Sequence, residues 1–252
     1  MLDATTAIAV RELRKLYGGK AAVDGLTLTV PRGSFFGFLG PNGAGKTTTI
    51  RMLTGLAQPS SGEIEILGFP MPERALEVKR RIGVVPDESV LFDRLTGGEF
   101  LEFAGRMYGL ERGVARERAR ELLALFELDA EPRKLIDEYS KGMRKRLAMA
   151  AALIHRPELF LLDEPFEGVD AVGARMMKDL LTSQVRQGAT VFLTSHVLEV
   201  VERLCDTVAI IHEGRLAMQG SMAELRERSE TLEDAFVRLV GAGPAAGKLD
   251  WL

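Results

Sequence analysis

Short runs of β-branched and aromatic residues predict strands in two separated parts of the chain. The predicted strands are residues 7–10, 26–30, 35–39, 63–67, 82–85, 159–162, 190–194 and 208–212. Residues 46–56 and 72–81 are predicted to be helical. Most of the strands are almost continuously apolar, which is typical of parallel strands covered by helices on both faces. We therefore expect a mostly parallel α/β sheet.

The middle of the chain, residues 87–156, has helical spacing and almost no strand signal. Apolar residues recur there on two helical faces, namely Ala119, Leu122, Leu123 and Phe126, and then Met143, Leu147, Ala150 and Ile154. We predict one domain over 1–252, with an α/β core from 1–86 and 157–220, an all-helical insertion from 87–156 and a helical tail from 221–252. Residues after about 240 are rich in glycine and alanine, and we expect them to be mobile.

The composition is that of an ordinary globular protein, with 46% hydrophobic and 27% charged residues among 252. A net charge of −3 argues against a protein that coats nucleic acid, so no nucleic-acid partner is expected. The single cysteine, Cys205, excludes an internal disulfide; we predict that it is buried and that the protein works in a reducing compartment. No apolar stretch approaches the roughly 20 residues that span a bilayer, and residues 7–10 are too short for a signal peptide. Any membrane role is expected to need a partner.

A glycine-rich segment between the predicted strand 35–39 and the predicted helix 46–56 matches the phosphate-binding pattern G-x-x-x-x-G-K-[ST]. It consists of Gly40, Pro41, Asn42, Gly43, Ala44, Gly45, Lys46 and Thr47, and Thr48 follows. Glycines let several N–H groups converge on phosphate oxygens, and the helix adds the positive end of its dipole. Lys46 supplies a charge to the phosphates, and the Thr47 hydroxyl is a ligand for Mg²⁺. The motif alone leaves kinases, GTPases, helicases and transporters open.

Acidic residues and a histidine follow two of the later strands. Asp163 and Glu164 come directly after 159–162, where Asp163 is placed to hold Mg²⁺ and Glu164 to polarise an attacking water. A solvated loop start is the alternative for this pair. His196 follows 190–194, and ligands bind at the carboxyl ends of parallel strands. The other two histidines are interpreted as ordinary surface or core residues.

Taken together and in this order, the motifs resemble those of the ATP-binding cassette (ABC) ATPases. The resemblance rests on Tyr17 at the aromatic A-loop position, the P-loop at 40–47, Tyr139-Ser140-Lys141-Gly142-Met143 at the signature, 159–163 at Walker B, 166–170 at the D-loop and His196 at the switch histidine. It covers about residues 7–240, and the signature segment is specific to this family.

This resemblance implies a P-loop NTPase fold with a RecA-like, mostly parallel core, an N-terminal antiparallel β part and the helical insertion. It implies ATP and Mg²⁺ as ligands, with adenine stacked on Tyr17. The implied metal residues are Thr47, Asp163 and Asp87, and the implied catalytic residues are Lys46, Glu164 and His196. Hydrolysis of ATP is the implied activity.

The resemblance also implies partners. In the family two chains sandwich two ATP molecules, so Ser140, Gly142 and Asp170 are expected to reach the ATP of a second, identical chain. The residues themselves predict that Ser140 caps a helix, and capping and phosphate binding use the same free N–H groups. A membrane-embedded permease is the other implied partner, and through it this chain is expected to sit at the cytoplasmic face of the cell membrane. The Ser-Lys-Gly-Met form of the signature looks like that of export cassettes.

Three positions depart from the usual family pattern. Lys141 and Met143 replace the commoner Gly and Gln of the signature. Asp87 stands where the family has the Q-loop glutamine; it is shorter and anionic, so it could bind Mg²⁺ directly or only through water. We expect activity to survive this change.

Several alternatives stay open at this stage. The apolar residues Val90, Leu91, Phe92 and Leu95 fit either packing inside the insertion or a groove for a short helix of the permease. The tail residues 222–240 could pack on the core or help dimerise. A soluble ABC-type switch acting on a non-membrane partner is the main rival function, and a non-hydrolysing regulatory cassette is a second, motivated by Asp87.

Overall fold

The computed structural model describes residues 5–88, 90–227 and 230–241. Its strands are β1 (Thr6–Tyr17), β2 (Lys20–Pro31), β3 (Phe35–Leu39), β4 (Ser61–Ile66), β5 (Phe69–Met71), β6 (Ile82–Val85), β7 (Leu159–Asp163), β8 (Thr190–Ser195), β9 (Thr207–His212) and β10 (Arg215–Ser221). Its helices are α1 (Lys46–Leu53), α2 (Ala75–Lys79), α3 (Gly97–Met107), α4 (Arg112–Leu125), α5 (Lys141–Leu153), α6 (Ala171–Arg186), α7 (Leu198–Leu204), α8 (Met222–Glu227) and α9 (Leu232–Val240), with a 3-10 turn η1 (Ile136–Glu138).

The main sheet has the strand order β10-β9-β3-β8-β7-β6 and is parallel except for the β10–β9 pair. Every residue of β3, β7 and β8 is buried, including the polar residues at the strand ends, as expected for central parallel strands. In the register of these strands, Leu39 pairs with Ser195 and Asp163 with Thr194. The residues that follow β3, β7 and β8 therefore meet at one edge of the sheet.

Alternate residues of β3 divide the core into two layers. Phe35 and Leu39 pack with helices α5, α6 and α9 in one hydrophobic cluster, whereas Phe36 and Phe38 pack with β1, β2 and α1 in the other. Phe192 of β8 stacks on Phe36 with ring centroids 5.5 Å apart. The main sheet is thus covered on both faces.

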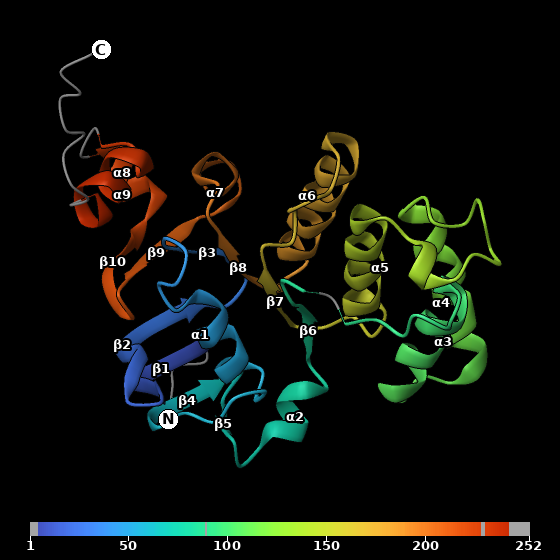
Figure 1. Ribbon diagram of the computed structural model, residues 1–252, viewed down its shortest axis with the longest axis horizontal. Helices are drawn as coiled ribbons and strands as arrows, with labels where there is room; N and C mark the ends of the chain where they lie inside the picture. The colour runs from blue at the N-terminus through green and yellow to red at the C-terminus, as the bar shows by residue number, and fades with distance from the viewer. Residues whose placement is uncertain (1–4, 89, 228–229, 242–252) are drawn as a thin grey trace.

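The N-terminal β part is a four-stranded antiparallel sheet of order β2-β1-β4-β5. The described residues between 87 and 156 form only helices, apart from one isolated bridge between Thr96 and Leu135. In Figure 1 these helices, α3 to α5, lie at one end of the molecule, and α8 and α9 lie at the other. The expected fold class is confirmed, whereas the domain boundaries at 87, 157 and 221 stay a prediction.

The structure lengthens two predicted strands and adds two others: β1 and β2 extend well beyond the predicted ranges 7–10 and 26–30. Strands β5 and β10 were not predicted. Pro70 interrupts the apolar pattern of β5, and β10 contains too many small and polar residues to show a strand pattern. The predicted helical tail consists of two helices: Thr231 caps α9, and Leu225 and Leu232 are buried against the main cluster. The expected mobility beyond residue 241 falls outside the described residues.

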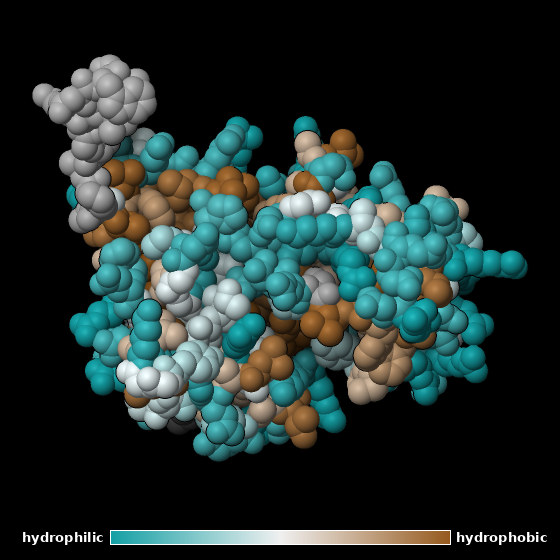
Figure 2. Space-filling model, in the orientation of Figure 1, coloured by the Kyte–Doolittle hydropathy of each residue, from teal (hydrophilic) through white to brown (hydrophobic). Residues whose placement is uncertain are grey.

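The expected burial of the single cysteine is confirmed. Cys205 is buried at 6% exposure. Within the described ranges, no helix combines the length and apolar character needed to cross a bilayer. Figure 2 shows a largely hydrophilic face at the end formed by α3 to α5, and hydrophobic surface gathered beside the C-terminal helices.

Candidate nucleotide-binding site

The loop between β3 and α1 needs its first and last glycines for steric reasons. Gly45 has φ of 110°, and a Cβ there would lie 2.5 Å from the carbonyl oxygen of Ala22. At Gly40 a Cβ would lie 2.4 Å from the carbonyl oxygen of Ile211. The two ends of the loop therefore pack directly against the main chain of β2 and β9, and this close packing fixes the conformation of the loop.

The first turn of α1 leaves its N–H groups free for an anion. Gly45 at the N-cap has no side chain to accept them, and the first turn contains no acidic residue. Lys46 is 8% exposed, and its Nζ donates to the carbonyl oxygens of Gly40 at 2.7 Å and Pro41 at 3.3 Å. The ammonium group is thus held against the loop itself.

The end of β7 places two carboxylates in different environments. Asp163 is 1% exposed, and the Thr194 hydroxyl on β8 donates to its Oδ1 at 2.5 Å. The same hydroxyl oxygen accepts the N–H of Glu164 at 3.2 Å. Glu164 has φ of 45°, in the left-handed region that a non-glycine residue rarely occupies. The main chain turns at Glu164, so the two neighbouring carboxylates have different partners: Asp163 contacts Thr194, and Glu164 contacts His196.

Glu164 faces the histidine that follows β8. Its Oε1 lies 3.0 Å from Nδ1 of His196, and the Glu164 side chain is only 12% exposed while that of His196 is 52% exposed. A carboxylate at this distance orients the imidazole ring by hydrogen bonding. The two residues form a pair at the edge where the glycine-rich loop also lies.

These groups surround one cavity of about 630 Å³. It is lined by Ala22, Pro41, Asn42, Gly43, Gly45, Lys46, Thr47, Thr48, Asp87, Asp163, Glu164, Glu167 and His196. Gly40 and Ala44 belong to the same loop but are buried and do not line the cavity. Tyr17 is not part of the lining; it is 49% exposed at the end of β1, with the Lys15 ammonium 5.0 Å from its ring centroid. Its stacking on a base stays a prediction.

The donor set at the cavity fits Mg²⁺. Thr47, Asp87 and Asp163 offer hydroxyl and carboxylate oxygens, which are the hard ligands that this ion prefers. Among the described residues, no group of three or more His, Cys, Asp or Glu side chains is arranged to hold a metal by itself. Mg²⁺ commonly binds through one or two carboxylates together with phosphate oxygens and water, so this set suffices.

Three predicted residues lie outside the cavity of their own chain. Ser140 caps α5 by accepting the N–H of Met143 at 3.2 Å, and Asp170 caps α6 by accepting the N–H of Gly173 at 2.9 Å. The Gly173 N–H is also the main reason that the pKa of Asp170 is lowered. Gly142 packs closely on the D-loop, because a Cβ there would lie 3.0 Å from the Gly168 carbonyl oxygen. The capping role predicted for Ser140 is confirmed.

Two residues near the cavity were missed by sequence reasoning. Glu167 lines it and accepts from Lys141 Nζ at 2.6 Å, and this contact lowers the pKa of Glu167 and raises that of Lys141. Its only sequence signal is its place within the D-loop segment, residues 166–170. Lys145 is buried beside the cavity at 3% exposure. It lies between two arginines in a run that looks like a solvated face, so no sequence signal marks it.

Comparison with known proteins identifies the family. The family model described as ABC transporter matches residues 23–167. The chain belongs to the ABC transporter family. It is 44% identical to the daunorubicin resistance ATP-binding protein DrrA3 of Streptomyces coeruleorubidus, over 88% of this chain and 71% of that protein. It is 41% identical to the bacitracin transport ATP-binding protein BcrA of Bacillus licheniformis, over 89% and 73%.

A solved ATP-binding subunit of an ABC transporter superposes on this ABC cassette with a TM-score of 0.86. The two chains are 31% identical, and the match covers 93% of this chain and 99% of the other. The cassette therefore has the α/β P-loop NTPase fold that the order of its motifs predicted.

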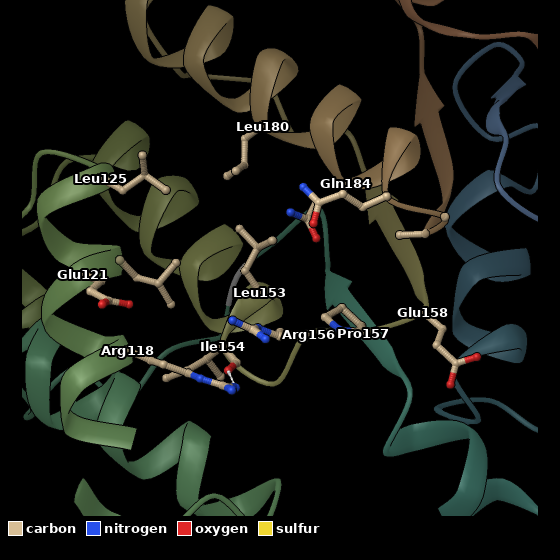
Figure 3. A pocket seen from close by; sticks show the side chains of 14 residues that line it. Arg118, Glu121, Leu125, Leu153, Ile154, Arg156, Pro157, Glu158, Leu180 and Gln184 are labelled. Carbon is tan, nitrogen blue, oxygen red and sulfur yellow. Dashed lines mark hydrogen bonds between the residues drawn. The ribbon is translucent and has the colours of Figure 1, made fainter. Parts of the chain in front are cut away.

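The cassette has a second cleft, of about 610 Å³, between α4, α5 and the C-terminal part of α6 (Figure 3). Arg118 reaches across it from α4 and donates to the Ile154 carbonyl oxygen at 2.8 Å. None of the predicted site residues lines this cleft, and we assign it no ligand.

Proposed function

We propose that this chain binds ATP with Mg²⁺ and hydrolyses it as the ATP-binding subunit of an ABC exporter. The observation that carries this proposal is the 3.0 Å contact between Glu164 Oε1 and His196 Nδ1 at the cavity that Lys46 and the glycine-rich loop also line. A loop built only to bind nucleotide does not need an acid–histidine pair beside the phosphate position. The relatives named for daunorubicin resistance and bacitracin transport support export.

The ATP phosphates bind to the loop from Gly40 to Thr48, and the adenine reaches Tyr17. Lys46 leaves the loop carbonyls to contact the β- and γ-phosphates, where its charge has a stronger partner. Thr47, Asp163 and Asp87 would hold Mg²⁺, which would neutralise charge on the phosphates.

Glu164 acts on the attacking water. Its carboxylate accepts a hydrogen bond from the water and directs the water oxygen at the γ-phosphorus. His196, oriented by Glu164, donates a hydrogen bond to a γ-phosphate oxygen. Together with Lys46 it stabilises the charge that develops during in-line displacement.

A second copy of the chain completes the site. Ser140 and Gly142 stand at the N-terminus of α5 and Asp170 at that of α6, yet none lines the cavity of its own chain. Helix N-termini suit phosphate, so the same residues of a second copy close over the bound ATP. We also propose the following division of the chain. Residues 1–86 and 157–220 form the nucleotide-binding core, residues 87–156 form the helical segment that carries Ser140, and residues 221–252 form the tail.

The proposed membrane contact lies on the helical segment. Leu91 is buried and Leu95 packs on the core, so these two residues serve packing. Val90 at 90% exposure and Phe92 at 51% stay on the surface, and Phe92 meets Phe103 edge to face at 5.3 Å. We propose that this exposed apolar surface receives the permease at the cytoplasmic face of the membrane. No nucleic-acid partner is proposed.

The test of hydrolysis is Glu164→Gln, measured as phosphate release together with nucleotide binding. Hydrolysis should fall by at least about 100-fold while ATP binding is kept, because the amide cannot accept a proton. Glu158→Gln is the matched control, since Glu158 precedes β7 at its opposite end and pairs with Arg81 on the surface. A Glu164→Gln protein with unchanged turnover would overturn the catalytic role, and a wild-type chain without turnover would indicate a regulatory cassette.

The test of the transporter role is purification of the tagged chain from mildly solubilised membranes. A polytopic membrane protein recovered in fixed ratio would support the permease partner. Recovery only from the soluble fraction, with ribosomes or with nothing bound, would favour the rival function of a soluble switch.

A further inference from the structure

Lys145 is a buried cation that binds only main-chain carbonyl groups among the described residues. Its Nζ donates to the carbonyl oxygens of Asp87 at 2.7 Å, Pro86 at 3.2 Å and Asp163 at 3.4 Å. Its helix neighbours Lys141, Arg144 and Arg146 all form ion pairs with acidic side chains instead. An ammonium group has three N–H donors, so these three carbonyls saturate it.

Two of the three carbonyls belong to residues that line the nucleotide cavity, Asp87 and Asp163. Pro86 and Asp87 follow β6, and Asp163 ends β7, which pairs with β6 in parallel. Asp87 and Asp163 are also the two acidic residues of the proposed Mg²⁺ site. One side chain from α5 therefore holds together the two strand ends that carry both proposed carboxylate ligands of Mg²⁺.

The same helix begins at the residue proposed to contact the second copy's ATP. Ser140 caps α5, and Lys145 lies five residues further along it. Any rotation of α5 that changes the position of Ser140 also pulls on the main chain at Asp87 and Asp163, because the Lys145 ammonium is bonded to both.

Packing alone does not explain a lysine at this position. Burial lowers the pKa of Lys145, which means that the buried environment disfavours the charged form, while the charges of Asp87 and Asp163 oppose that effect. Met or Leu would fill similar space without burying a charge. An apolar side chain, however, could not donate hydrogen bonds to three carbonyl oxygens at the ends of two strands.

We propose that Lys145 is a positioning residue for hydrolysis. Its ammonium fixes the main chain at Asp87 and Asp163 so that their carboxylates are preorganised for Mg²⁺, and it couples this arrangement to the signature end of α5. The inference rests on the proposed function, since it assumes that Mg²⁺ accompanies ATP at this cavity.

The experiment is Lys145→Met in the full chain, with ATP turnover and binding of a fluorescent ATP analogue both measured across a Mg²⁺ titration. The Mg²⁺ concentration that half-saturates binding should rise at least about 5-fold, because misplaced carboxylates bind the ion less tightly. Turnover at saturating ATP and Mg²⁺ should fall at least about 10-fold. Analogue affinity without Mg²⁺ should stay within about 3-fold, since the glycine-rich loop is intact.

Two further variants separate positioning from general stability. Lys145→Arg keeps a donor-rich cation and should recover most of the Mg²⁺ dependence. Arg118→Met is the matched control, because it removes another cation-to-carbonyl bond, at Ile154 beyond the far end of α5 and away from the cavity (Figure 3). It should leave the Mg²⁺ dependence unchanged.

The proposal is overturned if Lys145→Met retains the wild-type Mg²⁺ dependence, or if Arg118→Met shifts that dependence equally. Should Lys145→Met fail to fold, Lys145→Gln, which keeps two N–H donors, replaces it with the same readouts and a smaller expected shift. The binding titration requires no turnover. A wild-type chain that binds but does not hydrolyse would therefore reject the proposed hydrolysis while the Mg²⁺ shift still decides the role of Lys145.

Discussion

His196 Nδ1 lies 3.0 Å from Glu164 Oε1, and the contact joins residues from the ends of two neighbouring parallel strands. Thr194 reinforces this geometry by bonding to Asp163 and to the Glu164 N–H. The chain itself thus sets the pair in place beside the cavity, without a second copy. An acid and an imidazole placed in this way are expected to act as a unit.

We predict that His196→Ala lowers the single-turnover rate of ATP hydrolysis at least about 100-fold, with ATP affinity changed only a few-fold. Because Glu164 and His196 act together, Glu164→Gln combined with His196→Ala should be little slower than Glu164→Gln alone. Rapid-quench measurements of the three variants give this comparison. Effects that multiply in the double variant would show that the two residues work independently.

A second prediction concerns the stability of the glycine-rich loop. Gly45→Ala should lower the free energy of unfolding by about 2 kcal/mol or more, because φ of 110° is strained for alanine and the Cβ would meet the Ala22 carbonyl oxygen. Gly113→Ala in α4 meets no atom within 4 Å and should be neutral or stabilising by up to about 1 kcal/mol. Urea unfolding of both variants is the measurement. Equal stability of the two would contradict the steric explanation.

The parts of the fold that could be predicted are those with local signals. Residues 35–39 and 159–162 are short runs of mainly apolar residues, and each forms a buried strand. The start of the second tail helix also has a local signal in the sequence, since Thr231 and Asp234 form a capping box.

The site residues that belong to recognisable sequence motifs could be predicted. The positions of Lys46, Asp163 and His196 follow from parallel strand ends that share one sheet edge. The burial of Lys145 was not predictable, because its acceptors Asp87 and Asp163 are distant in sequence and only the folded chain brings their carbonyls together.

A third prediction concerns the exposed apolar surface at Phe92. Phe92→Glu should abolish transport in cells or vesicles while the ATP affinity of the isolated chain stays unchanged, because Phe92 is 51% exposed and lies outside the nucleotide cavity. Val237→Glu is the matched control: Val237 is 58% exposed on α9, at the opposite end of the molecule in Figure 1. Transport that survives Phe92→Glu, or that is lost equally in Val237→Glu, would count against the proposed permease surface.

The last prediction is a pH dependence of stability that originates at His155. Its ring stacks on Tyr108 with centroids 3.5 Å apart, and Nε2 lies 3.0 Å from the Ile82 carbonyl oxygen. Burial lowers the pKa of His155 to about 4, and the charge of Arg118 acts in the same direction. The folded chain therefore binds this proton less readily than the unfolded chain, whose histidine has a pKa near 6.5.

Between pH 6.5 and 4, unfolding consequently takes up a proton at His155, so the free energy of unfolding falls as the pH is lowered through this window. Above pH 6.5 both states are neutral there and this contribution to stability is complete. His155→Gln keeps an amide donor for the Ile82 carbonyl oxygen but cannot be protonated in this range. Between pH 7 and 4.5 it should lose about 1–2 kcal/mol less stability than the wild type, a value reduced for partial solvent exposure. Urea unfolding at both pH values tests this, and parallel pH profiles of the two proteins would contradict the assignment to His155.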